Sequence, residues 1–89
     1  MPTVKFAPAL TRHVPCPEQQ VAAPTLGAAL DAAFRAAPGL RGYVLDDQGA
    51  VRKHVAVFVN GQMIASRSEL GLGLAPADQV MVVQALTGG

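Results

Sequence analysis

The chain has 89 residues, of which 51% are hydrophobic and 15% charged, and seven Lys and Arg against six Asp and Glu give a net charge of +1. A chain of this length forms one small domain that buries only about 60% of the surface its unfolded form exposes. So thin a core disfavours a self-contained enzyme with a deep active site. The composition is too apolar for a disordered chain, and the lack of basic runs argues against a nucleic-acid partner.

The sequence also carries no sign of export or of membrane insertion. Cys16 is the single cysteine and excludes an internal disulfide, and the first residues lack the long apolar stretch of a signal peptide. Pro, Gly or a charge interrupts every apolar run well before the roughly 20 residues that cross a bilayer. We therefore expect a cytoplasmic protein that has no membrane partner.

Two short strands are predicted near the start of the chain. Residues 3–7 alternate apolar and polar side chains up to a proline, which favours a strand with Val4 and Phe6 toward the core. Residues 11–17 contain two prolines and suit a loop. Residues 20–23 then fit a second strand that forms a hairpin with the first.

One clear helix follows, and Thr25 is a plausible N-cap for it. Apolar side chains at spacings of four lie on one helical face: Leu26, Leu30 and Phe34. Asp31 and Arg35 are four apart and form a weak pair on the helix surface. Pro38-Gly39 ends the helix.

The middle of the chain predicts a long connection and then a hairpin. Residues 39–53 are polar and glycine-containing, which indicates a connection with at most a brief extended piece around 43–45. Residues 54–59 give the strongest strand pattern in the chain. Asn60-Gly61 favours a type I′ turn, and residues 62–64 return as a short antiparallel partner.

A loop at 65–78 and a last strand at 79–84 complete the predicted elements. Period-two alternation assigns these side chains to the core: Val55, Val57, Val59, Val80 and Val82. It turns these three outward: Phe58, Met81 and Val83. One amphipathic helix covers only one face of a sheet, so the face bearing these three residues is predicted to dock a partner.

The sequence offers no recognisable catalytic or metal-binding motif. The available nucleophiles and bases are His13, Cys16, His54, Ser66 and Ser68. None stands in a known arrangement, and a closed structural zinc site needs four ligands. Gly71-Leu72-Gly73 lacks the further glycine, the lysine and the helix of a phosphate-binding loop, so it predicts a turn. We expect no catalytic residue and no bound metal or cofactor.

The paired glycines Gly88 and Gly89 at the end of the sequence are a more informative feature. Having no Cβ, they allow an extended tail to enter a channel too narrow for other residues and to present its α-carboxylate to another enzyme. A frayed terminus without a role is the alternative explanation. Composition alone favours that alternative.

Four segments, in this order and spacing, resemble the ThiS/MoaD family of ubiquitin-like sulfur carriers. They are Thr25-Leu26 at the helix start, Val57-Phe58-Val59-Asn60-Gly61, Ala75-Pro76-Ala77-Asp78-Gln79-Val80, and Thr87-Gly88-Gly89. The order of the predicted strands and helix also matches, nearly end to end. One departure is Ala77-Asp78, where the family commonly has Gly-Asp. We expect a different turn there and nothing more.

The resemblance implies an α+β β-grasp fold with a mixed four- to five-stranded sheet and one main helix packed on one face. It implies a domain over residues 1–86 and a flexible Gly-Gly tail over 87–89. In this family an E1-like partner uses ATP to adenylate the terminal glycine, here Gly89, which then becomes a thiocarboxylate, with Gly88 as a spacer. The free carrier is expected to be a monomer and to pass sulfur to a biosynthetic enzyme, in some cases as its small subunit.

Three functions stay open at this point. The length and the long 39–53 segment look more like carriers that serve cysteine, molybdopterin or secondary-metabolite synthesis than like the compact thiazole-pathway carriers. A ubiquitin-like modifier would instead join Gly89 to lysines of other proteins. A plain interaction domain would have its Gly-Gly end by accident.

Overall fold

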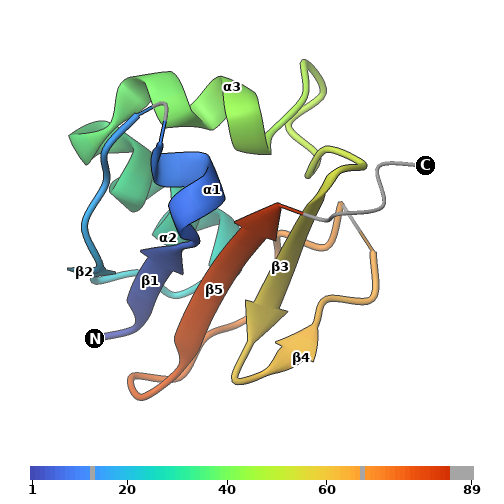
Figure 1. Ribbon diagram of the computed structural model, residues 1–89. Coiled ribbons are helices and arrows are strands. Elements are labelled where there is room, and N and C mark those ends of the chain that lie inside the picture. Colours follow the sequence, from blue (N-terminus) through green and yellow to red (C-terminus); the bar gives the residue numbers. More distant parts are fainter. Residues whose placement is uncertain (13, 67, 85–89) are drawn as a thin grey trace.

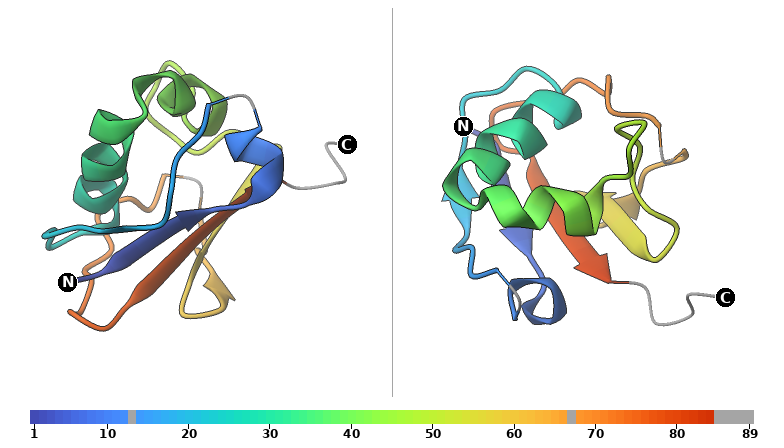
Figure 2. Two further views of the ribbon diagram at one scale, coloured as in Figure 1. Left: turned by 60° about the vertical axis from the view of Figure 1, so that its left-hand side comes forward. Right: turned by 90° about the horizontal axis from the view of Figure 1, so that it is seen from above.

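The computed structural model of the chain describes residues 1–12, 14–66 and 68–84. Its strands are β1 (Thr3–Phe6), β2 (Gln19–Gln20), β3 (Val55–Val59), β4 (Gln62–Met63) and β5 (Gln79–Gln84). Its helices are α1 (Pro8–Thr11), α2 (Leu26–Ala36), the 3₁₀ helix η1 (Pro38–Leu40) and α3 (Arg41–Val44). Within the described part of the chain, no helix is long and apolar enough to cross a membrane. Figures 1 and 2 show α2, η1 and α3 as a layer on one face of the sheet.

The five strands form one mixed sheet in the order β2-β1-β5-β3-β4. β1 and β5 are parallel neighbours at its centre, whereas the pairs β1 with β2, β3 with β5 and β3 with β4 are antiparallel. The chain leaves β1, passes through the helical layer and returns through β3 and β4 before β5 enters between β1 and β3. This is the predicted α+β β-grasp fold, and the predicted mixed sheet is confirmed with five strands.

The turn between β3 and β4 has the predicted type I′ geometry. Asn60 has φ 52° and Gly61 has φ 84°, and both values lie in the left-handed region that Asn and Gly tolerate best. The two-residue turn fixes the register, so Val59 pairs with Gln62 and Phe58 pairs with Met63.

Ala77 and Asp78 lie in a turn that leads into β5. The Asp78 N–H donates to the Ala75 carbonyl at 3.0 Å and closes a turn directly before β5. Asn60 is the one non-glycine residue in the described segments with a positive φ. Ala77 therefore keeps an ordinary backbone conformation, and this turn does not require a glycine.

The start of α2 is fixed by hydrogen bonds to its backbone N–H groups. Thr25 is the N-cap, and its Oγ1 accepts from the Ala28 N–H at 3.2 Å. The Leu26 and Gly27 N–H groups donate to the carbonyls of Leu72 and Leu70 at 2.8 and 2.7 Å. A Cβ on Gly27 would lie 3.1 Å from the Leu70 oxygen, so glycine permits this close approach of the loop.

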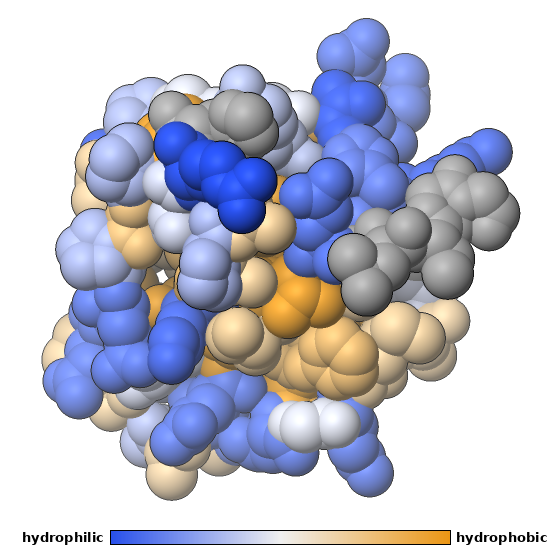
Figure 3. Space-filling view, in the orientation of Figure 1, coloured by the Kyte–Doolittle hydropathy of each residue, from blue (hydrophilic) through white to orange (hydrophobic). Residues whose placement is uncertain are grey.

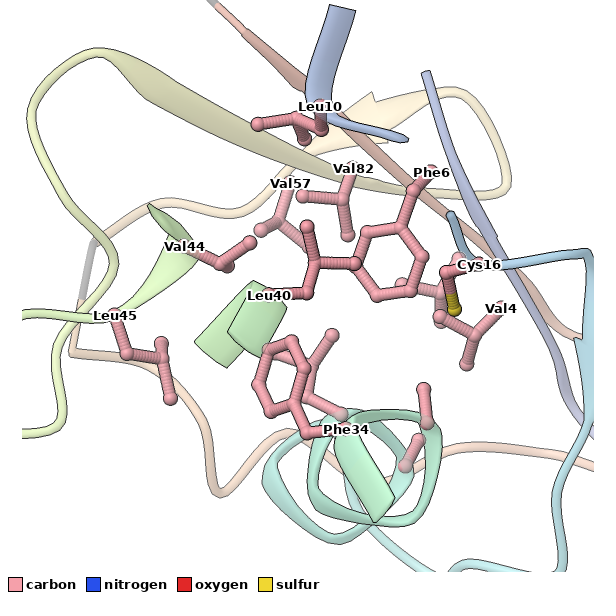
Figure 4. Close-up of a cluster of buried hydrophobic side chains, with 14 of the residues drawn as sticks. Val4, Phe6, Leu10, Cys16, Phe34, Leu40, Val44, Leu45, Val57 and Val82 are labelled. Carbon is pink, nitrogen blue, oxygen red and sulfur yellow. The ribbon is translucent and has the colours of Figure 1, made fainter. Parts of the chain in front are cut away.

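The core lies between the helical layer and one face of the sheet, and η1 and α3 contribute to it as well as α2. In Figure 4 Leu40 lies in the middle of the labelled side chains, with Phe6 and Phe34 on either side of it. The two rings are 6.0 Å apart between centroids. Leu40 and Val44 are fully buried, and Leu30 of α2 is only 1% exposed. The predicted stripe of α2 is therefore confirmed, but it supplies only part of the helical side of the core.

The expectation for residues 39–53 is wrong over its first part. Residues 38–44 are helical, and no extended piece forms around Tyr43. Leu45 makes an isolated antiparallel bridge with Val51 after α3 has ended. Local propensity in this glycine-containing segment is weak, and burial of Leu40 and Val44 against the sheet stabilises the helical turns instead.

Three smaller expectations also need correction. β2 is Gln19–Gln20 and not 20–23, because the chain turns away after the Val21 N–H donates to the Pro2 carbonyl at 2.8 Å. The short helix α1 (Pro8–Thr11) was not predicted, and it overlaps the predicted loop at 11–17 only at Thr11. Asp31 pairs with Arg41 of α3 at 2.7 Å and not with Arg35.

The packing predicts that Leu30→Ala and Leu40→Ala each lower the free energy of unfolding by about 2 to 5 kcal/mol, since each leaves a cavity in a thin core. Thermal and urea melts measure the loss. Met63→Ala is the control, because the Met63 side chain is 62% exposed, and it should change stability little. A Leu40→Ala variant as stable as the control would contradict the assignment of η1 and α3 to the core.

Candidate functional site

The sheet face opposite the helices carries a row of side chains that crosses four strands. Lys5 of β1 pairs with Met81 of β5, Met81 with Phe58 of β3, and Phe58 with Met63 of β4. We call this set the cross-sheet row. Val4 and Phe6 flank Lys5, Val80 and Val82 flank Met81, and all four are buried in the core, as is Val57 before Phe58. Met63 lies on the same face because it pairs with Phe58. The row therefore lies wholly on the open face.

Along the strands, the open face changes from polar to apolar. At one end Thr3 pairs with both Gln20 and Gln79, and at the other end Val83 pairs with Ala56. The apolar end is the end toward which β5 runs. Figure 3 shows apolar side chains gathered over β5 and β3 on this face, with hydrophilic side chains below them.

The three residues predicted to face outward lie together on this open face. Phe58, Met81 and Val83 are half-buried, because neighbouring side chains on the same face cover part of each. Val59 is half-buried and not fully in the core, unlike the other predicted core valines. Sequence reasoning missed Met63, which is 62% exposed. The Asn60-Gly61 turn contained the signal, because a two-residue turn places Met63 opposite Phe58.

The remaining predicted positions do not form a site. Gly88, Gly89 and His13 lie outside the described residues, as does the expected boundary between the domain and the tail at 86 and 87. Cys16 is buried and accepts a hydrogen bond from the Gln19 amide at 3.1 Å. In the described segments no three residues among His, Cys, Asp and Glu gather as metal ligands.

The register of the open face depends on hydrogen bonds between Asn60 and the start of β5. The Asn60 amide donates to the Asp78 carboxylate at 2.8 Å and accepts from the Gln79 N–H at 2.9 Å. The second Asp78 oxygen accepts from the Ala75 N–H at 2.8 Å. These bonds hold the β3–β4 turn against β5 and thereby keep Phe58 beside Met81.

These hydrogen bonds lower the pKa of the Asp78 carboxyl below its ordinary value. The Asn60 amide has the largest effect and the Ala75 N–H the next, against a smaller opposing effect of desolvation. Both donors stabilise the ionised form, because a carboxylate accepts at both oxygens.

A chain with this sheet topology is a ubiquitin-like β-grasp protein, and solved structures of similar proteins have the same fold. SAMP1 of Haloferax volcanii is 28% identical and superimposes with a TM-score of 0.80, over 99% of this chain and 98% of its own. CysO of Mycobacterium tuberculosis is 21% identical, with a TM-score of 0.80 over 97% and 100% of the two chains. A chain of the BexX/CysO complex of Amycolatopsis orientalis is 16% identical, with a TM-score of 0.82 over the full length of both.

These neighbours are ubiquitin-like sulfur carriers and modifiers of the ThiS/MoaD kind, so the resemblance seen in the sequence is confirmed. The two CysO chains, at 21% and 16% identity, support the fold alone. The neighbours are small carrier or modifier proteins and not enzymes. No protein-family model matches the chain, and neither does any curated protein.

The lowered pKa of Asp78 predicts a pH-dependent contribution to stability. The contribution is complete above the ordinary carboxyl pKa of about 3.9 and is lost as the pH falls through the lower, folded-state value. We expect Asp78→Asn to melt at a lower temperature than wild type at pH 7, since an amide accepts at one oxygen only. The gap should begin to shrink as the pH falls below about 4, because Asp78 of the unfolded chain then takes up a proton while the folded protein, with its lower pKa, still holds the carboxylate.

Asp47→Asn, a change in an exposed aspartate of the turn before β3, is the control and should melt like wild type throughout. A gap between wild type and Asp78→Asn that stays constant from pH 7 to pH 3 would contradict this account.

Proposed function

We propose that the chain is a sulfur carrier whose terminal Gly89 is adenylated by an E1-like partner and converted to a thiocarboxylate. The observation that carries the proposal is the end-to-end likeness to SAMP1 together with the Gly-Gly end of the sequence. In this proposal the chain itself binds no permanent cofactor, and the partner uses ATP. The sulfur then passes to an enzyme that synthesises cysteine, molybdopterin or another sulfur-containing metabolite.

The layout of the open face supports this role. A carrier must be held by its partner so that the residues after β5 reach the partner's active site. The apolar end of the open face, with Phe58, Met81 and Val83, is the end toward which β5 runs. A partner docked there holds the strand that leads directly into the terminal residues.

The chemistry explains why the carrier needs no reactive side chain. A carboxylate is a poor electrophile, because its negative charge repels nucleophiles. Attack of the Gly89 carboxylate on the α-phosphorus of ATP forms an acyl adenylate and releases pyrophosphate. A sulfide or persulfide sulfur then attacks the acyl carbon, and AMP leaves. With sulfide the product is the thiocarboxylate, whereas an enzyme persulfide gives an acyl disulfide that a thiol must reduce.

Modification of other proteins is a second candidate, favoured by the same likeness to SAMP1, whose full name is small archaeal modifier protein 1. A second structure of the Haloferax volcanii protein is 26% identical to this chain, with a TM-score of 0.73 over 96% of it. In that role a lysine amine would attack the same acyl adenylate, and an isopeptide bond would form as AMP leaves. Both roles share the first step, so the acceptor distinguishes them.

The tail carries the first functional prediction. Deleting Gly88 and Gly89 should abolish sulfur transfer and leave the melting temperature nearly unchanged, since chain ends contribute little to packing. Gly88→Val should act similarly, because a β-branched side chain does not fit a narrow channel. The measurement is the intact mass after incubation with the E1-like enzyme of the source organism, ATP and a sulfur source.

A carrier gains the mass of one oxygen-to-sulfur exchange at its C-terminus, whereas a modifier becomes joined to lysines of other proteins. If neither species forms while the same enzyme modifies another carrier, the proposal is wrong. A plain interaction domain would then be the better account.

The second functional prediction concerns the docking face. Phe58→Asp should fold, because Phe58 lies outside the core, but it places an unpaired carboxylate in an apolar contact. The loss of affinity for the E1-like enzyme should be tenfold or more, on the order of the loss at an interface hot spot. Calorimetry measures the affinity, and a thermal melt checks the fold.

Tyr43→Asp is the matched control, because Tyr43 is a 42% exposed aromatic residue of α3 in the helical layer. It should bind the enzyme like wild type. Wild-type affinity in the Phe58→Asp variant would exclude this face as the docking surface.

A further inference from the structure

The cross-sheet row has one charged member, and it lies at an end of the row. Lys5 stands on β1 beside Met81, while Phe58 and Met63 continue the row to the far edge of the sheet. Three strand spacings of about 4.8 Å give the row a length of about 14 Å. All other strand residues that share this face are uncharged: Thr3, Gln20, Ala56, Gln79 and Val83.

Lys5 has no counter-ion within the described residues. It is exposed, and the one ion pair of the described segments joins Arg41 to Asp31 in the helical layer. Glu18 directly precedes β2 and is the nearest acidic residue by register, but it forms no ion pair with Lys5. The acidic residue before β5, Asp78, is already hydrogen-bonded to Asn60 and Ala75. The ammonium group of Lys5 is therefore available to a partner.

The apolar side chains of the row and the charge of Lys5 at its end have different effects on docking: the first favour association, and the second selects an orientation. Apolar contact is non-directional, so the strip from Met81 to Met63 favours association without fixing the rotation of the partner about the face. A charge at one end distinguishes the two ends of the strip. It therefore selects one orientation of the partner relative to β5.

We propose that Lys5 orients the adenylating partner through an acidic residue of that partner, which pairs with Lys5 while apolar side chains cover Met81, Phe58 and Met63. The partner surface is thus an apolar strip with a carboxylate at one end. This inference rests on the proposed function and adds to it a residue that sets orientation. A correct orientation directs the residues after β5 toward the active site of the partner, so Lys5 acts on adenylation through positioning.

The test compares charge variants at two positions by calorimetry and by ATP–pyrophosphate exchange with the E1-like enzyme of the source organism. Lys5→Glu should weaken binding about tenfold or more at low salt, and Lys5→Met should weaken it less. Lys5→Arg should restore wild-type affinity, because it keeps the charge. The difference between wild type and Lys5→Glu should shrink as salt rises from about 0.05 to 0.5 M, since ions screen exposed pairs.

Arg35→Glu is the matched control, an equal charge reversal at an exposed position of α2 in the helical layer. Its affinity should equal that of wild type at every salt concentration. Orientation gives a second readout: at saturating enzyme, Lys5→Met should still show a slower exchange rate, which a role in affinity alone would not produce. Thermal melts of all four variants establish that each is folded.

The outcomes separate the inference from the proposed function. If wild type supports exchange but Lys5→Glu binds like Arg35→Glu, the inference about Lys5 is overturned, whereas the adenylation step of the proposed function stands. Equal salt dependence of Lys5→Met and wild type would also overturn it. If wild type neither binds the enzyme nor supports exchange, the proposed function fails, and the inference fails with it.

Discussion

Burial of one sheet face by one helical layer is the interaction on which the rest of this structure depends. Leu30 of α2 and Leu40 of η1 fill the space above Val57 and Val82 of the sheet, and all four are almost completely buried. A chain of 89 residues has enough apolar side chains for one such layer and not for a second one. The opposite sheet face is therefore left to water or to a partner.

As a consequence, the two sheet faces have different roles: one stabilises the fold, and the other is open to a partner. Side chains that alternate along β3 and β5 either stabilise the fold or form the open face, so a change on the open face leaves the core largely intact. This separation suits a protein that must fold alone and then bind other proteins through a constant surface. It also places β5, the strand before the terminal residues, between β1 and β3 at the centre of the sheet.

Small polar contacts then set the details that the core leaves undetermined. Asp78 and Asn60 fix the turn after β3 against the start of β5, and Thr25 together with the Leu70 and Leu72 carbonyls fixes the start of α2. Each contact satisfies backbone or side-chain groups at the end of an element, where regular hydrogen bonding stops. The proposed activity needs from the folded part a stable platform and a docking face, and no reactive side chain, because the activating chemistry belongs to the partner.

The sequence by itself determined the elements whose signals are local. The strand at Val55–Val59, the Asn60-Gly61 turn, the strand at Gln79–Gln84 and the helix after Thr25 follow from alternation, turn chemistry and capping. The outward position of Phe58, Met81 and Val83 followed from the same alternation. Tertiary structure alone decided that residues 38–44 are helical and that Asp31 pairs with Arg41. It also decided that Lys5 lies at one end of the cross-sheet row and Met63 at the other. Each of these depends on contacts between residues distant in sequence, whose free energy outweighs weak local propensity and leaves no periodic trace in the chain.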